Sequence, residues 1–194
     1  MTLPISRSQA LELLKSMPQT DADMNHYLEA EAIMKELAVK LNQDAEYWGM
    51  LGLLHDVDWE LTKDNVSEHC IKCVDILKEK GFDEEFIQII QSHGYGFDLI
   101  PSLKDKKRTK PIEHALAASE TLTGIIYAYA LMRGGKVSDM ELSGLKKKFK
   151  DKRFAANCNR EIVKECELIP LPLDDFLQLS IEAIKKIKED IKLI

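Results

Sequence analysis

The sequence predicts an all-α protein. Apolar residues recur every three or four positions through nearly the whole chain, and the alternating pattern typical of strands is almost absent. The chain has 194 residues, of which 45% are hydrophobic and 31% charged, so it can bury a sizeable core and does not have the composition of a disordered protein. We see no internal repeat and no low-complexity linker. We therefore expect a single domain, 1–194, built of roughly eight helices.

The first five helices are expected at about residues 6–17, 23–41, 44–57, 67–81 and 83–93. Breakers mark their ends: Pro18 follows the first, Gly81 the fourth and Gly94 the fifth. Ser67 and Asp83 are the expected N-caps of the fourth and fifth helices, because their side chains can accept hydrogen bonds from free backbone N–H groups.

The second half begins with a long loop at 94–110, and loops of this length in compact domains often act as lids or binding segments. Pro111 suits the first turn of a long helix that reaches about residue 131. Ser138 and Glu141 form a capping box before the next helix, which ends in the basic run LKKKFKDKRF. Two further helices are expected, at about 160–167 and from Asp174 onward.

Charge and targeting signals exclude several kinds of partner. The net charge of −6 argues against a nucleic-acid polymer, which needs a basic surface. The N-terminus lacks the pattern of a signal peptide, and no apolar run approaches membrane-spanning length. The four cysteines then indicate reduced thiols. We therefore expect a cytoplasmic protein without a membrane partner.

Several side chains that can bind metal fall on inward faces. The apolar run GMLGLL leads directly into His55 and Asp56, and a buried charge without a partner is costly. Inward positions on other predicted helices hold His26, His69, His93 and Glu120. A shared cation would satisfy all six at once. Imidazole and carboxylate ligands suit Fe, Mn, Ni, Co or Zn, and the sequence does not choose among these.

Cys70 and Cys73 form a Cys-x-x-Cys, which is typical of some zinc and redox sites. The pair falls within a predicted helix and no second pair lies at a suitable spacing, so the favoured interpretation of Cys73 is a small core residue.

The order of these motifs resembles the HD-domain superfamily of metal-dependent phosphohydrolases. The resemblance starts at His26 and the His55-Asp56 pair, and continues through HCIKCVDIL with His69, IIQSHG with His93 and ALAASETLTG with Glu120. It covers about residues 20–130, the expected metal-binding core, and leaves about 136–194 as a helical extension. The family usually has Asp where this chain has Glu120.

The resemblance implies one or two divalent transition-metal ions. The first would be held by His26, His55, Asp56 and Glu120, and the second by Asp56, His69 and His93. Asp56 would then be catalytic as a bridging ligand. Asp58 would either accept a hydrogen bond from a ligand imidazole or act as a base on the attacking water. Basic candidates for binding the substrate phosphate are Lys72, Arg133 and Arg160.

The expected function is a metal-dependent phosphohydrolase, either a phosphomonoesterase or a phosphodiesterase, acting on a small phosphorylated metabolite or nucleotide. Two alternatives stay open. Some proteins of this fold carry a di-iron centre with the same ligand pattern and are oxygenases, and a chain with an altered acid position can be a non-catalytic metabolite or nucleotide sensor. The sequence does not determine the oligomeric state.

Overall fold

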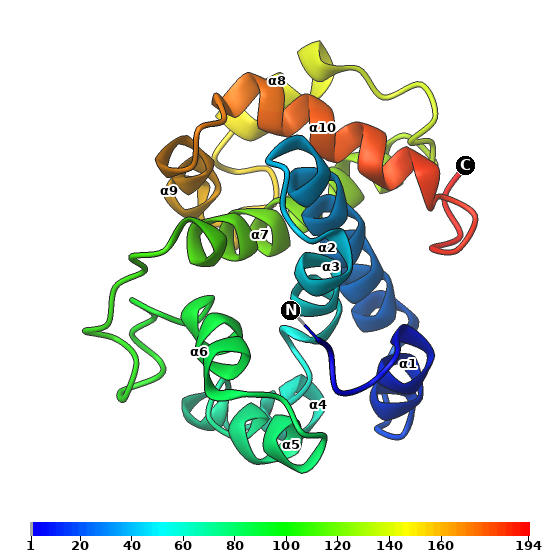
Figure 1. Ribbon diagram of the computed structural model, residues 1–194. Helices are drawn as coiled ribbons and strands as arrows, with labels where there is room; N and C mark the ends of the chain where they lie inside the picture. Colours follow the sequence, from blue (N-terminus) through cyan, green and yellow to red (C-terminus); the bar gives the residue numbers. More distant parts are fainter. Residues whose placement is uncertain (1) are drawn as a thin grey trace.

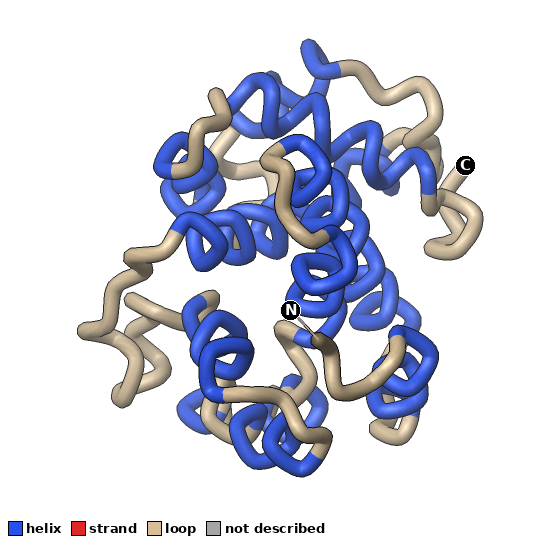
Figure 2. The backbone as a smooth tube through the Cα atoms, viewed as in Figure 1, coloured by secondary structure: helices blue, strands red, loops and turns tan. Residues whose placement is uncertain are grey.

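The computed structural model describes residues 2–194, which are helical and contain no strand (Figure 2). The α-helices are α1 (Arg7–Lys15), α2 (Asp21–Lys40), α3 (Ala45–Leu54), α4 (Trp59–Thr62), α5 (Cys73–Glu79), α6 (Glu84–Ser92), α7 (Pro111–Met132), α8 (Leu142–Lys150), α9 (Arg160–Val163) and α10 (Leu173–Lys186). Two 3-10 helices, η1 (Val66–Glu68) and η2 (Lys164–Leu168), complete the described part. The all-α prediction is confirmed. Helices α4 and α9 have only four residues each, which leaves eight longer α-helices in the described part, as expected.

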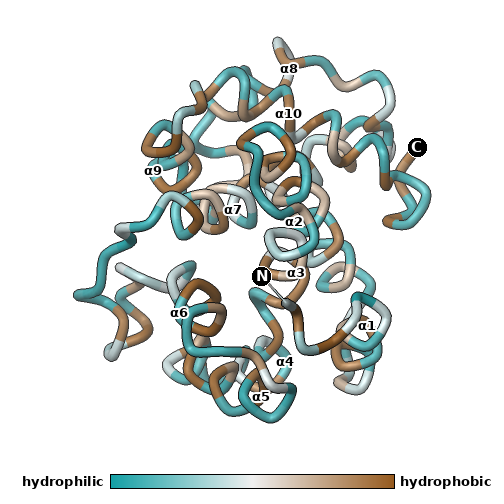
Figure 3. The backbone as a smooth tube through the Cα atoms, viewed as in Figure 1, coloured by the Kyte–Doolittle hydropathy of each residue, from teal (hydrophilic) through white to brown (hydrophobic). Residues whose placement is uncertain are grey.

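Helix α2 lies at the centre of the protein. It packs along α3, and α7 and α10 cover its other sides (Figure 1). Fully buried side chains such as Ile33, Leu37 and Leu54 fill the space between these helices. Helix α6 packs on α3 and α7. It is amphipathic, with both hydrophobic and hydrophilic positions along its length (Figure 3). The core thus surrounds the ends of α3 and α6, where the predicted metal ligands lie.

Helix α7 is long and apolar enough to cross a membrane by length and composition alone. However, 61% of its most apolar window is buried inside the protein, against α2, α6, α9 and η2. Its hydrophobicity is therefore accounted for by packing within the domain.

Two predicted N-caps are wrong. The hydroxyl of Ser67 donates to the side chain of Asn65, and α5 begins only at Cys73, because the backbone of Cys70 has a left-handed φ of 61° that a continuous helix cannot accommodate. The amide of Ser138 donates to the carbonyl of Ile194 near the C-terminus, and α8 begins only at Leu142, four residues after Ser138. By contrast, Asp83 caps α6 as expected.

The close approach of α2 and α3 depends on Gly52. A Cβ at this position would lie 2.6 Å from the carbonyl oxygen of Ala30 and 2.8 Å from the amide nitrogen of Glu31, both of which are backbone atoms of α2. Gly49, one turn earlier on the same helix, differs, because a Cβ there would meet only the flexible side chain of Lys35.

We expect Gly52→Ala to lower the free energy of unfolding by about 1–3 kcal/mol, since α2 and α3 must separate to admit the methyl group. The matched variant Gly49→Ala should be neutral or stabilising, because alanine favours the helix and Lys35 can move aside. Denaturant unfolding of both variants measures the difference. Equal effects of the two substitutions would contradict the proposed close packing.

A carboxylic acid is also buried in α2. Glu29 is 1% exposed, and its Oε1 has no hydrogen-bond partner among residues 2–194. Burial raises the pKa of Glu29 well above its usual value of 4.5. Its carboxyl group therefore stays protonated in the folded protein at pH values where the unfolded chain ionises.

This raised pKa predicts a pH-dependent stability. The contribution of Glu29 is fully present below the unfolded pKa and is lost as pH rises toward the folded pKa, because the unfolded state releases a proton that the folded state retains. Glu29→Gln should therefore gain stability relative to the wild type as pH increases from about 4 to about 8. Parallel denaturant titrations across this range provide the measurement, and a difference that stays constant with pH would refute the assignment.

Candidate metal centre

The His55-Asp56 pair lies where α3 stops. His55 is the C-cap of the helix, and Val57 and Trp59 continue the chain as tight turns, with amides that donate to the carbonyls of Leu54 and Asp56. Neighbouring side chains in a regular helix do not face each other. Ending the helix at this point allows both members of the pair to reach one site.

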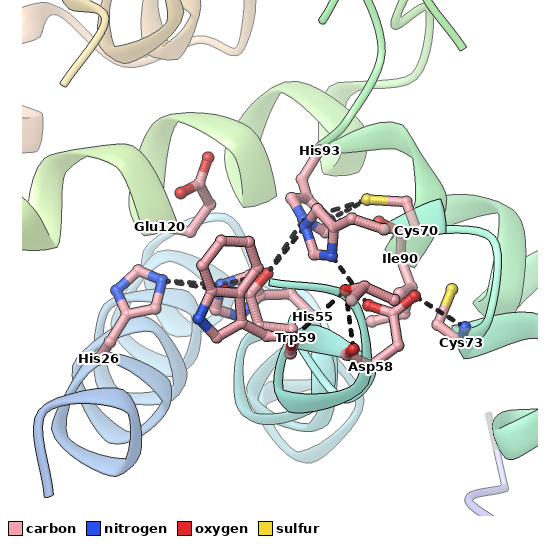
Figure 4. Close-up of polar contacts among 12 residues, drawn as sticks. His26, His55, Asp58, Trp59, Cys70, Cys73, Ile90, His93 and Glu120 are labelled. Atoms are coloured by element: carbon pink, nitrogen blue, oxygen red, sulfur yellow. Dashed lines mark hydrogen bonds and ion pairs between the residues drawn. The ribbon is translucent and has the colours of Figure 1, made fainter. Parts of the chain in front are cut away.

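The other imidazoles come from three separate segments. His26 lies on α2 and His93 is the C-cap of α6 (Figure 4). His69 follows η1. His69 was expected on a helix, but its backbone is extended, with φ −63° and ψ 143°. The structure nevertheless brings all four predicted histidines to the carboxylate of Asp56.

Each of these histidines uses its Nδ1 to donate a hydrogen bond away from the centre. The acceptors are the carbonyl of Gly52 for His55 at 2.8 Å, the carbonyl of Ile90 for His93 at 2.6 Å, the carboxylate of Asp58 for His69 at 2.9 Å and the hydroxyl of Thr123 for His26 at 2.7 Å. The Thr123 hydroxyl itself donates to the carbonyl of Glu120, so it acts as acceptor toward the ring. In each neutral ring the lone pair is therefore on Nε2.

The four Nε2 atoms converge. Those of His26 and His55 lie 2.9 Å apart, and those of His69 and His93 lie 3.2 Å apart. The carboxylate of Asp56 lies 3.2–3.7 Å from all four. Lone pairs at these separations repel unless a proton or a cation lies between them. Divalent ions would satisfy all four rings and the carboxylate together.

The electrostatics favour positive charge at this place. Burial opposes ionisation of Asp56, but the surrounding imidazoles hold its pKa well below the usual range. Burial lowers the pKa of His55 to about 3, so this ring stays neutral and its lone pair stays available. The His26 side chain is 28% exposed and that of His55 is fully buried, so the centre opens to solvent on the His26 side.

Glu120 is not brought into the cluster. It lies on α7 with its carboxylate directed away from His26 and His55 (Figure 4), and this carboxylate accepts a hydrogen bond from the Thr121 hydroxyl at 2.6 Å. The groups of ligand atoms within 4.8 Å of one another, in the part of the chain described, are His26, His55 and Asp56 on one side and His69, Cys70 and His93 on the other. Burial raises the pKa of Glu120, as expected for a carboxylate held without a counter-charge in contact.

Asp58 is fully buried, and its two oxygens have different partners. Oδ1 accepts from His69, and Oδ2 accepts from the amide of Cys73 at 2.9 Å. Of the two predicted roles, these contacts favour orienting the imidazole over acting as a base on water, because Asp58 is sealed from solvent and both oxygens are held by protein donors.

Two contributors were missed in the sequence. Thr123 supports His26 and follows Glu120 by three residues, so helical spacing alone would have placed it on the same face of α7. The Cys-x-x-Cys was not favoured as a metal or redox site, but the sulfur of Cys70 lies 3.4 Å from Nε2 of His93. Its left-handed backbone conformation gives no signal in the sequence.

Two of the three residues predicted to bind phosphate are engaged elsewhere in the structure. Arg160 is buried, and its guanidinium donates to the carbonyls of Phe149, Asp151, Phe154, Ala155 and Cys158. Arg133 pairs with Asp139 at the far end of α7, about 20 Å along the helix from Glu120. Lys72 remains a candidate, since it is exposed and pairs with the half-buried Glu68 at 2.7 Å.

Another arginine, Arg108, stabilises the backbone on both sides of His93. Arg108 donates to the carbonyls of Ser92 and Tyr95, which flank His93, and forms a two-pronged ion pair with Glu165 at 2.6 Å. Glu165 also accepts from the ring of His114 at 2.6 Å. This network ties the C-cap of α6 to η2.

A model of the HD domain matches residues 24–124, just over half of the chain. The protein therefore belongs to the HD-domain superfamily of metal-dependent phosphohydrolases, and the arrangement of its histidines around Asp56 is compatible with metal binding. Comparisons with curated proteins and with solved structures found no match.

The contacts of Asp58 generate a prediction. Asp58→Asn should weaken metal binding by about 10–100-fold, because the amide holds the ring of His69 less firmly and removes a negative charge beside it. Competition with a metal-binding dye measures the affinity. Asp64→Asn, a change at an exposed carboxylate six residues further along the chain, is the control and should leave the affinity unchanged.

Proposed function

We propose that this protein is a metal-dependent phosphohydrolase acting on a small phosphorylated metabolite or nucleotide. The observation that carries the proposal is the set of four imidazoles whose Nδ1 atoms are all engaged by acceptors and whose Nε2 atoms converge on Asp56. Purely structural histidines would each need a separate buried partner at Nε2.

The separations between donor atoms fit bound ions. With a metal–nitrogen bond of about 2.0–2.1 Å and tetrahedral angles, two imidazole nitrogens on one ion lie about 3.3 Å apart. The observed separations are 2.9 Å for His26 and His55 and 3.2 Å for His69 and His93. One ion would be held by the first pair and a second by the other pair, with Asp56 between them.

A bound divalent ion lowers the pKa of a coordinated water and polarises a phosphoryl oxygen. The chain's own residues prepare the place for this chemistry. Asp56 keeps its negative charge, and the neutral ring of His55 stays inside the core. Water and substrate would enter at the exposed edge of His26. Lys72, three residues beyond His69, would balance charge on the phosphate after leaving its surface partner Glu68.

The substrate class follows from the surroundings. A centre reached past one partly exposed histidine suits a small molecule, and the net charge of −6 disfavours a nucleic-acid polymer. We place this activity in the cytoplasm, with no membrane partner.

The proposal predicts that purified protein carries a transition metal in stoichiometric amount and releases phosphate or a monoester product in a metal-dependent manner. His55→Ala and Asp56→Ala should lose both metal and activity, because each removes a donor from the converging set. Elemental analysis and a screen of phosphatase and phosphodiesterase substrates with added divalent ions test this. A metal-loaded protein that binds but does not cleave such compounds would instead indicate a sensor. An iron-loaded protein with intense visible absorption and oxygen uptake would indicate an oxygenase.

Glu120 decides whether the first ion has a fourth protein ligand. We expect Glu120 to leave Thr121 and turn toward the ion, so Glu120→Gln should reduce the metal content of the first position, while Glu120→Asp should retain it. Metal-to-protein ratios after dialysis give the comparison. Full retention by Glu120→Gln would mean that His26, His55 and Asp56 hold this ion alone.

A further inference from the structure

A thiol lies beside the second pair of imidazoles. The sulfur of Cys70 is 3.4 Å from Nε2 of His93, and the ligand atoms of His69, Cys70 and His93 all lie within 4.8 Å of one another (Figure 4). We propose that Cys70 is a thiolate ligand of the second metal ion, which makes this position selective for thiophilic metals. The inference rests on the metal centre of the proposed function and adds to it the identity of the ion.

The separations match a shared ion. Bonds of about 2.3 Å to sulfur and about 2.0–2.1 Å to nitrogen, at tetrahedral angles, place the two donors about 3.6 Å apart. The observed sulfur–nitrogen separation of 3.4 Å is close to this value, as is the 3.2 Å between the two imidazole nitrogens. The Nδ1 atoms of both rings are engaged elsewhere, so the two lone pairs face the same volume. The sulfur also lies 3.9 Å from Nδ1 of His93, so it stands beside this ring, and a rotation of the Cys70 side chain would turn it into that volume.

The chain is shaped to bring the sulfur to this volume. Cys70 is fully buried and has a φ of 61°, a conformation that is uncommon for residues other than glycine. Directly opposite is Gly94, where a Cβ would lie 2.7 Å from the Cys70 sulfur. The absence of a side chain immediately after His93 therefore leaves space for the thiol.

The alternative role, packing of Cys70 in the core, does not explain why its sulfur lies beside His93. Its apolar neighbours are the small cluster of Ile100 and Leu103 under the loop, and these do not require a sulfur aimed at His93. Cys73, by contrast, belongs to the main core, and it meets the centre through its backbone amide, which donates to Asp58. The two cysteines of one Cys-x-x-Cys therefore serve as a matched pair for experiment.

A thiolate ligand changes which ions the centre accepts. Soft sulfur donors favour zinc, iron and cobalt, whereas manganese and magnesium prefer oxygen. Binding requires the thiol to give up its proton, which leaves to solvent as the ion enters. The first position, made of imidazole and carboxylate alone, does not carry this preference.

Cobalt(II) provides the test, because a thiolate bound to it produces an intense charge-transfer absorption in the near ultraviolet that imidazole and carboxylate do not. The metal-free full-length chain is titrated with Co2+, and both this band and the weak visible bands are followed. We expect the wild type and Cys73→Ala to develop the near-ultraviolet band and Cys70→Ala to lack it. Cys70→Ala should also bind its second Co2+ at least about tenfold more weakly. Circular dichroism verifies that each variant is folded.

The outcomes separate the two proposals. Visible cobalt bands without a near-ultraviolet band in the wild type would overturn the thiolate assignment and leave the metal centre intact. No cobalt binding at all would overturn both. A near-ultraviolet band that persists in Cys70→Ala would assign the sulfur ligand to another cysteine and refute the proposal.

A second variant keeps Cys70 in place. Gly94→Ala should displace the sulfur from His93 and weaken the near-ultraviolet band, although the thiol itself is still present. Competition between Co2+ and Mn2+ gives an independent readout, because the preference for cobalt at the second position should fall in Cys70→Ala and Gly94→Ala but not in Cys73→Ala. An unchanged preference in the first two variants would refute the proposed selectivity.

Discussion

The repulsion among four converging imidazoles around Asp56 is the constraint on which the rest of the structure depends. Four segments must be held so that each ring finds an outward acceptor for Nδ1 and presents Nε2 inward. The buried contacts of α2 with α3 and α7 supply the rigidity that this arrangement requires. Without bound cations, protons between the Nε2 atoms must relieve this repulsion; burial opposes protonation of His69, but its contacts with Asp56 and Asp58 raise its pKa above the usual value.

Helix ends are used repeatedly to build this centre. His55 and His93 are both C-caps, and each donates its Nδ1 to a carbonyl three residues earlier, at Gly52 and Ile90. The carbonyls at a helix C-terminus carry partial negative charge and favour a nearby cation. Terminating α3 and α6 at the ligands thus serves two purposes, since it orients the rings and adds favourable electrostatics that no charged side chain has to provide.

The sequence predicted the all-α class and the convergence of His26, His55, Asp56, His69 and His93, because apolar periodicity determines which face of a helix turns inward. It failed where local geometry overrides periodicity. The left-handed Cys70 interrupts the fourth predicted helix, and the burial of Arg160 follows from carbonyls brought together only in the folded chain. The roles of Asp58 and Thr123 needed coordinates as well, since they depend on hydrogen-bond direction rather than on residue type or spacing.

The pairing of Arg108 with Glu165 gives the C-terminal segment a role in the architecture of the centre. Arg108 holds the carbonyls around His93, and Glu165 in turn holds Arg108 and His114. The extension is therefore connected by hydrogen bonds to the part of the domain that carries the histidine cluster. A substitution at Glu165 would loosen Arg108 and thereby shift His93, which Glu165 does not contact. Sequence change at Glu165 should therefore be constrained by the geometry of the histidine cluster.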